Sequence, residues 1–369
     1  MRNTTMSVCK GIAIILMVVG HAEAPELITN FIYTFHMPIF FIAAGYFFTA
    51  KYLSEPWTFV ARRFKGLYVP FLKWSLLFLL LHNVFFHYGI LNEQFGNWTG
   101  GVTHPYTFDV AMRRIWRMIT SMSGYDEFMA GAFWFFRGLL VASILYMVLA
   151  RLLQNATHRG LGACAAVICL LMAAVVYFRL KFDVNYFPLP NGGWREIWGV
   201  FFFGIGVIFS QYHSRIKYQG LISVACLAFL CYAATQHFCG MNNGANYADI
   251  ITLPLTGTAG FFMIHTLSGI INRRESWLKR MLVYIGDNTL YVFVFHIIAF
   301  KSVSLLKIWW YDLPFEQIGC HMVIHDMRPD LFWIPYSIAG VALPLLWLYC
   351  YRAVPRPWTA VRRLIMNYK

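Results

Sequence analysis

The amino-acid sequence predicts an all-α membrane protein whose helices cross the bilayer about ten times, with both chain termini in the cytosol. Two observations set the class: 59% of the 369 residues are hydrophobic and only 12% are charged. Too few polar side chains remain to cover a water-soluble domain of this size. The third observation is that the apolar residues gather in segments of bilayer length, separated by polar connections.

Ten apolar segments have about the length that an α-helix needs to span a membrane. No internal repeat, low-complexity stretch or phosphate-loop pattern interrupts them, so one membrane domain, residues 1–369, accounts for the chain. The predicted spans are residues 8–24, 31–50, 66–86, 133–150, 160–178, 197–212, 219–235, 248–271, 282–300 and 331–351.

The positions of Lys and Arg predict the orientation. Nineteen of the thirty lie at the termini or in the even-numbered connections, and nine lie in the odd-numbered connections, although some of those are longer. Because cytosolic loops carry the excess of Lys and Arg, both termini are predicted to be cytosolic. The same clusters explain the net charge of +14 as signals that face anionic membrane lipid, and they argue against nucleic-acid binding.

The N-terminus also has features of a secretory signal peptide. Arg2 and Lys10 precede an apolar run that ends in Ala22-Glu23-Ala24, a pattern typical of a cleavage site. Pro25 would directly follow the cut, and cleavage would remove the first predicted span. We therefore favour a first membrane span over a cleaved signal.

Lys10 and His21 are the most informative residues of the first span. Eleven positions at 100° each come to about 20° past three turns, so both side chains lie on one helix face, about 16 Å apart. His36 enters the second span at a similar predicted depth, and Pro38 frees the carbonyl of Thr34 beside it. Ionisable groups and irregular backbone inside a membrane usually mark a functional cavity.

Four segments around these residues resemble the acyltransferase type 3 family of membrane proteins, and most closely its fucose 4-O-acetylase-like branch. The resemblance runs in order from about residue 6 to residue 300. The segments are Lys-Gly-Ile-Ala-Ile-Ile-Leu-Met-Val-Val-Gly-His at 10–21, Phe-His-Met-Pro-Ile-Phe-Phe-Ile-Ala-Ala-Gly-Tyr at 35–46, Phe-Trp-Phe-Phe-Arg-Gly-Leu at 133–139 and Tyr-Ile-Gly-Asp-Asn-Thr-Leu-Tyr-Val-Phe-Val-Phe-His at 284–296.

The resemblance implies an enzyme of the bacterial cytoplasmic membrane. It would transfer an acyl group, usually acetyl from cytosolic acetyl-CoA, to a hydroxyl of a carbohydrate or lipid-linked glycan at the outer face. The family's first motif commonly begins with Arg and ends with the catalytic His, and Lys10 and His21 take those positions. Lys keeps the charge but loses the bidentate fork. The basic residues at the start of the family's third span, which bind the coenzyme, correspond to Arg62, Arg63 and Lys65.

Acyl transfer to an alcohol needs a base, support for an oxyanion and a means of holding the donor. We expect His21 to be the base or, alternatively, the nucleophile that accepts the acyl group. His36 would orient His21 or the acceptor. Lys10, Arg62, Arg63 and Lys65 would hold the phosphates of coenzyme A, although the same cations also suit lipid headgroups.

Three more residues are candidates for the acceptor side. Trp134 would form a wall of the pocket, and Arg137 would meet an acceptor oxygen or the oxyanion. His296 lies deep in the ninth predicted span, where it would contact substrate or make a structural hydrogen bond. Asp287 and Asn288, at the start of that span, are interpreted first as helix caps.

The outer connections carry weaker signals. Apolar residues at four-three spacing between residues 108 and 122 predict a helix lying on the outer leaflet. Asp312, Glu316 and Asp330 offer sugar contacts.

His321, His325 and Asp326 are too few and too poorly spaced to predict a metal site. Cys239 and Cys320, both in outer loops, have the potential to pair.

A transporter or flippase is the alternative function. Proton-coupled carriers also place Lys, Arg and His inside a helical bundle. Such a protein would consume no thioester. The chain has no two halves with matching interrupted spans, which makes this alternative weaker.

Overall fold

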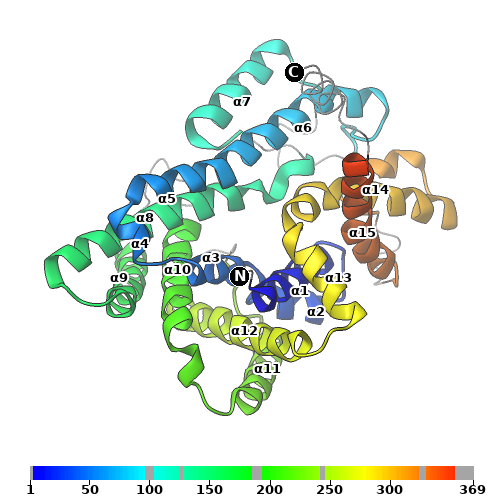
Figure 1. Cartoon of the computed structure of the whole chain (residues 1–369). Helices are drawn as coiled ribbons and strands as arrows, with labels where there is room; N and C mark the ends of the chain where they lie inside the picture. The colour runs from blue at the N-terminus through cyan, green and yellow to red at the C-terminus, as the bar shows by residue number, and fades with distance from the viewer. Residues whose placement is uncertain are drawn as a thin grey trace, which may run out of the picture.

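The structure is a computed structural model that describes residues 3–95, 104–124, 128–184, 193–241, 246–323 and 330–353. Within these ranges every regular element is helical (Figure 1). The elements are α1 Thr4–Gly20, α2 Glu26–Tyr33, α3 His36–Tyr46, α4 Lys51–Ser54, α5 Pro56–Arg63, the π-helix η1 Phe64–Tyr68, α6 Val69–His87, α7 Phe108–Ser121, η2 Phe128–Phe133, α8 Trp134–Thr157, α9 Leu161–Phe182, α10 Trp194–Tyr212, η4 His213–Arg215, α11 Gln219–Thr235, α12 Asp249–Asn272, α13 Trp277–Asp287, α14 Thr289–Trp310, η5 Phe315–Gly319 and α15 Trp333–Ala353.

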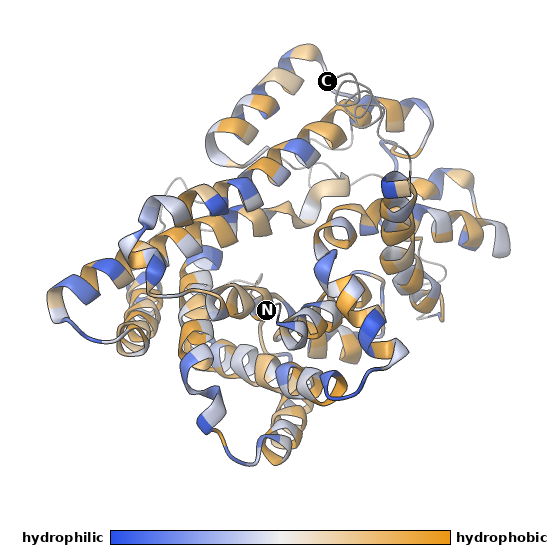
Figure 2. Cartoon of the chain, in the orientation of Figure 1, coloured by the Kyte–Doolittle hydropathy of each residue, from blue (hydrophilic) through white to orange (hydrophobic). Residues whose placement is uncertain are grey.

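The prediction of a helical, multi-pass membrane protein is confirmed. In the described part of the chain, seven helical segments are long and apolar enough to cross a membrane: Glu26–Tyr46, Pro56–His87, Met129–Thr157, Leu161–Phe182, Asp249–Asn272, Thr289–Trp310 and Trp333–Ala353. Figure 2 shows how apolar residues dominate these helices. The other three predicted spans coincide with α1, α10 and α11, which have 17, 19 and 17 residues. The count of about ten therefore stays a prediction.

Two predicted spans are interrupted where the sequence suggested continuous helices. The span 31–50 is divided at Thr34 and Phe35 into α2 and α3, and the span 282–300 is divided at Asn288 into α13 and α14. The first span also ends early, because α1 stops at Gly20. Only a few polar residues mark these breaks, so hydropathy averaged over a whole span does not reveal them.

Close packing of α1 against α13 fixes one end of the bundle. A Cβ atom on Gly11 would lie 2.3 Å from the carbonyl oxygen of Leu282, and one on Gly286 would lie 1.8 Å from that of Ser7. The Ser7 hydroxyl also donates a hydrogen bond of 2.8 Å to Asp287. The beginning of α1 therefore lies beside the junction between α13 and α14.

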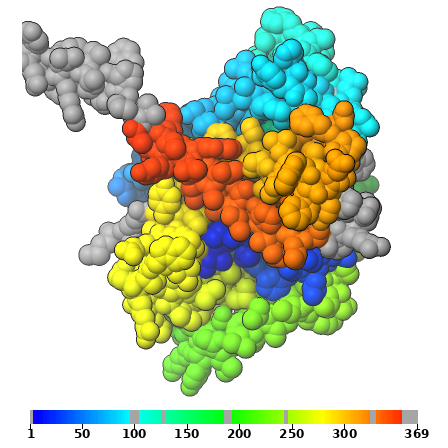
Figure 3. Space-filling model, turned by 90° about the vertical axis from the view of Figure 1, so that its right-hand side faces the viewer, coloured from blue at the N-terminus to red at the C-terminus, as the bar shows by residue number. Residues whose placement is uncertain are grey.

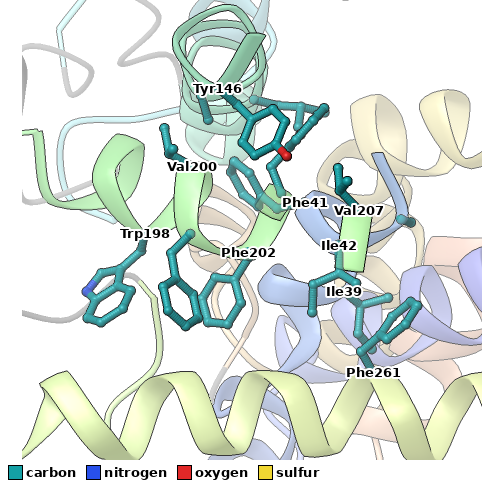
Figure 4. Close-up of a cluster of buried hydrophobic side chains, with 14 of the residues drawn as sticks. Ile39, Phe41, Ile42, Tyr146, Trp198, Val200, Phe202, Val207 and Phe261 are labelled. Carbon is teal, nitrogen blue, oxygen red and sulfur yellow. The ribbon is translucent and has the colours of Figure 1, made fainter. Parts of the chain in front are cut away.

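The largest apolar core lies around α3 and α10. Figure 4 shows Phe41 and Ile42 of α3 interleaved with Phe202 and Val207 of α10, with Phe261 of α12 below them. These side chains have at most 1% of their surface exposed. This core holds α3, whose first residue is His36, against the rest of the bundle.

The predicted amphipathic helix is confirmed as α7, which lies beside α6 in Figure 1. Met118 is fully buried, and the Tyr68 hydroxyl donates to the carbonyl oxygen of Ile119. Phe108 and Trp116 remain 80% and 67% exposed. Exposed aromatics on a helix with cationic neighbours suit a membrane surface.

Candidate active site

Two histidines from distant parts of the chain form a direct contact. His21 is the C-cap residue of α1, and His296 lies two turns into α14. The Nδ1 atom of His21 is 3.0 Å from the Nε2 atom of His296. His296 is buried, whereas His21 is half-buried. The sequence had suggested both residues, but not that they touch.

The backbone around His296 determines where the protons of this pair lie. The Nδ1 atom of His296 is 2.9 Å from the carbonyl oxygen of Phe293 and 3.2 Å from that of Val292. A carbonyl only accepts, so this nitrogen carries the proton. In a neutral pair, Nε2 of His296 then accepts from the Nδ1–H of His21. The Nε2 atom of His21 is left with a free lone pair, as a base or nucleophile requires.

His36 presents a second free lone pair. It is the first residue of α3, and its Nδ1 atom donates to the carbonyl oxygen of Ile32 at 3.0 Å. Its ring lies 5.2 Å from the ring of Tyr33. The Nε2 atom is buried and has no hydrogen-bond partner within the described ranges. The Tyr33 hydroxyl donates a hydrogen bond of 2.8 Å to the carbonyl oxygen of Gly20, the residue before His21.

An apolar cavity of about 180 Å³ lies along α1 next to these histidines. Ile14 and Met17 line it, and with Lys10 and His21 they follow the spacing of a single helix face. The cavity is lined by Ile14, Met17, Met37, Phe40, Gly66, Leu67, Phe135, Phe136, Thr289, Leu290 and Phe293. Its walls therefore come from α1, α3, η1, α8 and α14.

The three basic residues near the start of the third span differ in their surroundings. Arg62 is exposed and donates to the hydroxyl of Tyr52 at 2.9 Å. Arg63 is half-buried, and its guanidinium carbon lies 4.9 Å and 5.5 Å from the ring centroids of Phe59 and Phe203. Arg63 thus has a packing role in the structure, whereas Arg62 remains accessible.

Lys65 is the basic residue beside the cavity. It is exposed and lies within the π-helix η1, directly before the cavity residues Gly66 and Leu67. Short π-helical turns inside longer helices occur frequently at functional sites. Lys10 lies on α1, about one turn before the cavity residue Ile14, and is half-buried.

Arg137 already has a carboxylate partner. Its Nε atom lies 3.2 Å from Oε1 of Glu196, and the two side chains are only 4% and 3% exposed. Nearby, the guanidinium of Arg195 stacks on Trp134 at 4.3 Å. The contact of Arg137 or Trp134 with an acceptor stays a prediction. Sequence reasoning missed Glu196, although a buried arginine in a membrane span requires a counter-charge.

A polar cluster continues from the histidine pair toward the other end of the bundle. Lys301 is buried, and its Nζ atom donates to the carbonyl oxygens of Ile318 at 2.6 Å and Cys320 at 2.5 Å. Burial, together with the charges of His21 and Lys301, lowers the pKa of His321 to about 3. His321 is therefore a neutral imidazole at physiological pH. The sequence offered His321 only as a weak metal ligand, whereas the structure packs its ring 6.2 Å from that of Phe300, one turn after His296.

Glu23 follows His21 by two residues and also belongs to this cluster. Its φ of 56° is in the left-handed region, which is uncommon for a residue with a side chain. Burial raises the pKa of its carboxyl group, while Lys307 opposes that effect. Lys307 forms an ion pair of 2.7 Å with Asp330. The ninth predicted span ends at residue 300, whereas α14 continues to Trp310 and contains both Lys301 and Lys307.

The predicted helix caps, the two outer cysteines and the histidines of the last outer connection lie outside the histidine pair. Asp287 accepts from Ser7 as described above, and Asn288 accepts a hydrogen bond of 3.0 Å from Arg352 instead of capping α14 with its side chain. Cys239 and Cys320 are free thiols. Among the described residues no group of His, Cys, Asp and Glu is arranged to hold a metal ion. Residues 325 and 326 lie outside the described ranges.

The fold and the site together define a polytopic helical membrane protein with a hydrogen-bonded histidine pair beside an apolar cavity. Comparison with known families identifies it further: the family model Acyl_transf_3, described as an acyltransferase domain, matches residues 3–352. The chain belongs to this family of membrane acyltransferases. No curated protein and no solved structure gave a significant match.

Proposed function

We propose that the protein is a membrane O-acetyltransferase that carries acetyl from cytosolic acetyl-CoA to a hydroxyl of a glycan or lipid-linked glycan at the outer face of a bacterial cytoplasmic membrane. The observation that carries this proposal is the contact between His21 and His296, in which Nε2 of His21 takes no part. His21 follows the cavity residue Met17 by about one helical turn. The fucose 4-O-acetylase-like branch of the family is the closest fit to the sequence motifs.

In the proposed reaction His21 acts as a general base. Its Nε2 atom takes the proton of the acceptor hydroxyl while that oxygen attacks the thioester carbonyl. The tetrahedral intermediate then collapses, the carbon–sulfur bond breaks and the proton passes to the departing CoA sulfur. The free Nε2 of His36 accepts a hydrogen bond that orients the acceptor. An acetyl-imidazole on His21 is the alternative route, in which the acceptor attacks that intermediate after CoA has left.

In this reaction acetyl-CoA binds at the end of the bundle where α1 begins. Lys10, Arg62 and Lys65 bind phosphates of coenzyme A, and Arg63 adds charge from a packed position. The cavity between them and the histidines is narrow and apolar, which suits an extended pantetheine arm better than a bulky group. The interval of about 16 Å along α1 is comparable to the length of that arm.

The acceptor binds at the opposite end of the helical bundle. Glu23 and His321 offer hydrogen bonds to sugar hydroxyls, and Trp134 and Arg137 complete the substrate side. His296 acts on the acceptor through His21, which it holds by a hydrogen bond. This arrangement requires both termini in the cytosol and about ten membrane crossings, as the distribution of Lys and Arg predicts.

The test is transfer of label from radioactive acetyl-CoA in membranes that contain the protein. Wild type should release CoA and place label in a surface or lipid-linked glycan, and His21→Ala should lower both rates by at least about 10²-fold. His87→Ala, at the far end of α6, is the matched control and should keep the wild-type rate. Equal CoA release by wild type and His21→Ala would refute the assigned base, and an absence of thioester consumption would favour the transporter.

A further inference from the structure

Lys73 faces the membrane from inside a candidate span. It lies in the second turn of α6, within Pro56–His87, and its side chain is exposed. Within the described ranges it has no carboxylate partner, and its Nζ atom lies 4.3 Å from the ring centroid of Trp74. An unpaired charge on a membrane-facing surface is costly, so a group from outside the protein is expected to neutralise it.

Lys73 stands at one end of a groove between α6, α14 and α15. The groove has a volume of about 630 Å³ and is lined by Lys73, Trp74, Leu76, Leu77, Leu80, Tyr291, Phe295, Pro344, Trp347, Leu348 and Tyr351. Figure 3 faces this side of the molecule, with α15 in red, α14 in gold to orange and α6 in blue above them. Apart from Lys73, the lining is apolar or aromatic.

The groove has a polar end and an apolar end. Lys73 and Leu80 are seven residues apart on α6, which is about 10 Å along the helix. Pro344 and Tyr351 are also seven residues apart, on α15, and α15 runs antiparallel to α6. Contacts between Trp74 and Phe295, at 4.9 Å, join α6 to α14 along this length.

A second cation reinforces the polar end. Arg352, in the last turn of α15, donates to Asn288 at 3.0 Å, and its guanidinium carbon lies 5.9 Å from the ring centroid of Tyr291. Neither Asp nor Glu lines the groove. The end of the groove that holds Lys73 is therefore positive, and the remainder is apolar.

We propose that this groove binds an anionic phospholipid, with the phosphate at Lys73 and Arg352 and one acyl chain along Trp74, Phe295 and Trp347. Because no Asp or Glu lines the groove, the two cations favour a lipid of net negative charge over a zwitterionic lipid, whose own cation they would repel. Long lysine side chains reach toward headgroups from such depths, and aromatic rings suit this boundary.

The proposed site lies behind the helix that carries His296. Tyr291 and Phe295 of α14 face the groove, while Leu290 and Phe293 line the cavity beside the histidine pair. The site is separate from the acyl-transfer chemistry, and its test needs no acyl donor.

The experiment is native mass spectrometry of the purified full-length protein with equimolar phosphatidylglycerol and phosphatidylcholine. Wild type should retain phosphatidylglycerol preferentially, and Lys73→Gln should lower that retention about fivefold. Leu80→Trp fills the apolar end while keeping both cations, and should lower retention of both lipids. Lys51→Gln removes an exposed lysine that pairs with Glu55 and should behave as wild type.

Two outcomes would overturn the proposal: equal retention of the two lipids by wild type, or unchanged phosphatidylglycerol retention by both groove variants. Thermal unfolding of each variant without added lipid identifies any that fail to fold. Because Lys73→Gln and Leu80→Trp alter the groove in different ways, loss of one variant leaves the other as a test.

Discussion

His296 controls which nitrogen of His21 is free. The two backbone carbonyls that hold its Nδ1 proton fix its tautomer, and this tautomer fixes that of His21. His296 is thus a positioning residue that does not itself need to touch the acceptor. The arrangement resembles the logic of hydrolytic triads, in which a third group holds the base in its reactive tautomer.

We expect His296→Leu to lower kcat by about 10²-fold with little change in the KM for acetyl-CoA, because His21 loses the acceptor that orients it. His296→Gln places an amide oxygen near the position of Nε2 and should restore part of the rate. Steady-state kinetics on both variants provide the test. A purely structural role predicts equal losses for the two, in parallel with their thermal stability.

At the scale of helices, close packing explains why the sequence motifs contain glycines that take no part in the proposed reaction. Gly11 and Gly286 belong to the first and last motifs, and each allows a close approach between α1 and α13. These contacts place the end of α1 next to α14, so the two histidines can meet. These glycines carry no reactive group, and they position the site by allowing the two helices to approach.

Gly286→Ala should destabilise the protein by about 1–3 kcal/mol, because its Cβ would overlap the carbonyl oxygen of Ser7. Gly269→Ala in α12 is the matched control. A Cβ there meets nothing within 4 Å, so the expected effect is neutral or stabilising by about 0.5–1 kcal/mol. Thermal unfolding in detergent compares the two. Equal melting temperatures would show that the contact between α1 and α13 is not tight.

If the cavity is the path of the acyl donor, a bulky side chain in its wall should slow the reaction. Gly66 lines it, and a Cβ added there meets nothing within 4 Å. We expect Gly66→Leu to project into the donor path and lower kcat/KM for acetyl-CoA while leaving thermal stability unchanged. Gly66→Ala should retain most activity. If Gly66→Leu transferred acetyl as fast as wild type, the donor would reach His21 by another path.

At the scale of the whole molecule, composition predicted a membrane protein because every helix that crosses lipid must carry mostly apolar side chains. Pro38 and the predicted caps Asp287 and Asn288 indicated irregular backbone near Thr34–Phe35 and Asn288. They did not indicate that each span would divide into two helices, since that depends on how neighbouring helices pack. Lys10, His21 and His36 were found through their contrast with apolar surroundings. Glu23 was interpreted as part of a cleavage-site pattern, His321 as a weak metal ligand, and Glu196 lies one residue before a predicted span. Only tertiary contacts reveal their places in the site.

The central claim is that acetyl enters at the end of the bundle where α1 begins and is transferred at His21. The most direct measurement uses sealed membrane vesicles of both orientations, with labelled acetyl-CoA added outside. The account predicts label in glycan only for vesicles that expose the cytosolic face, with the product inside and protected from added esterase, and none for His21→Ala. Equal labelling of intact vesicles that expose the outer face, or full labelling by His21→Ala, would contradict it.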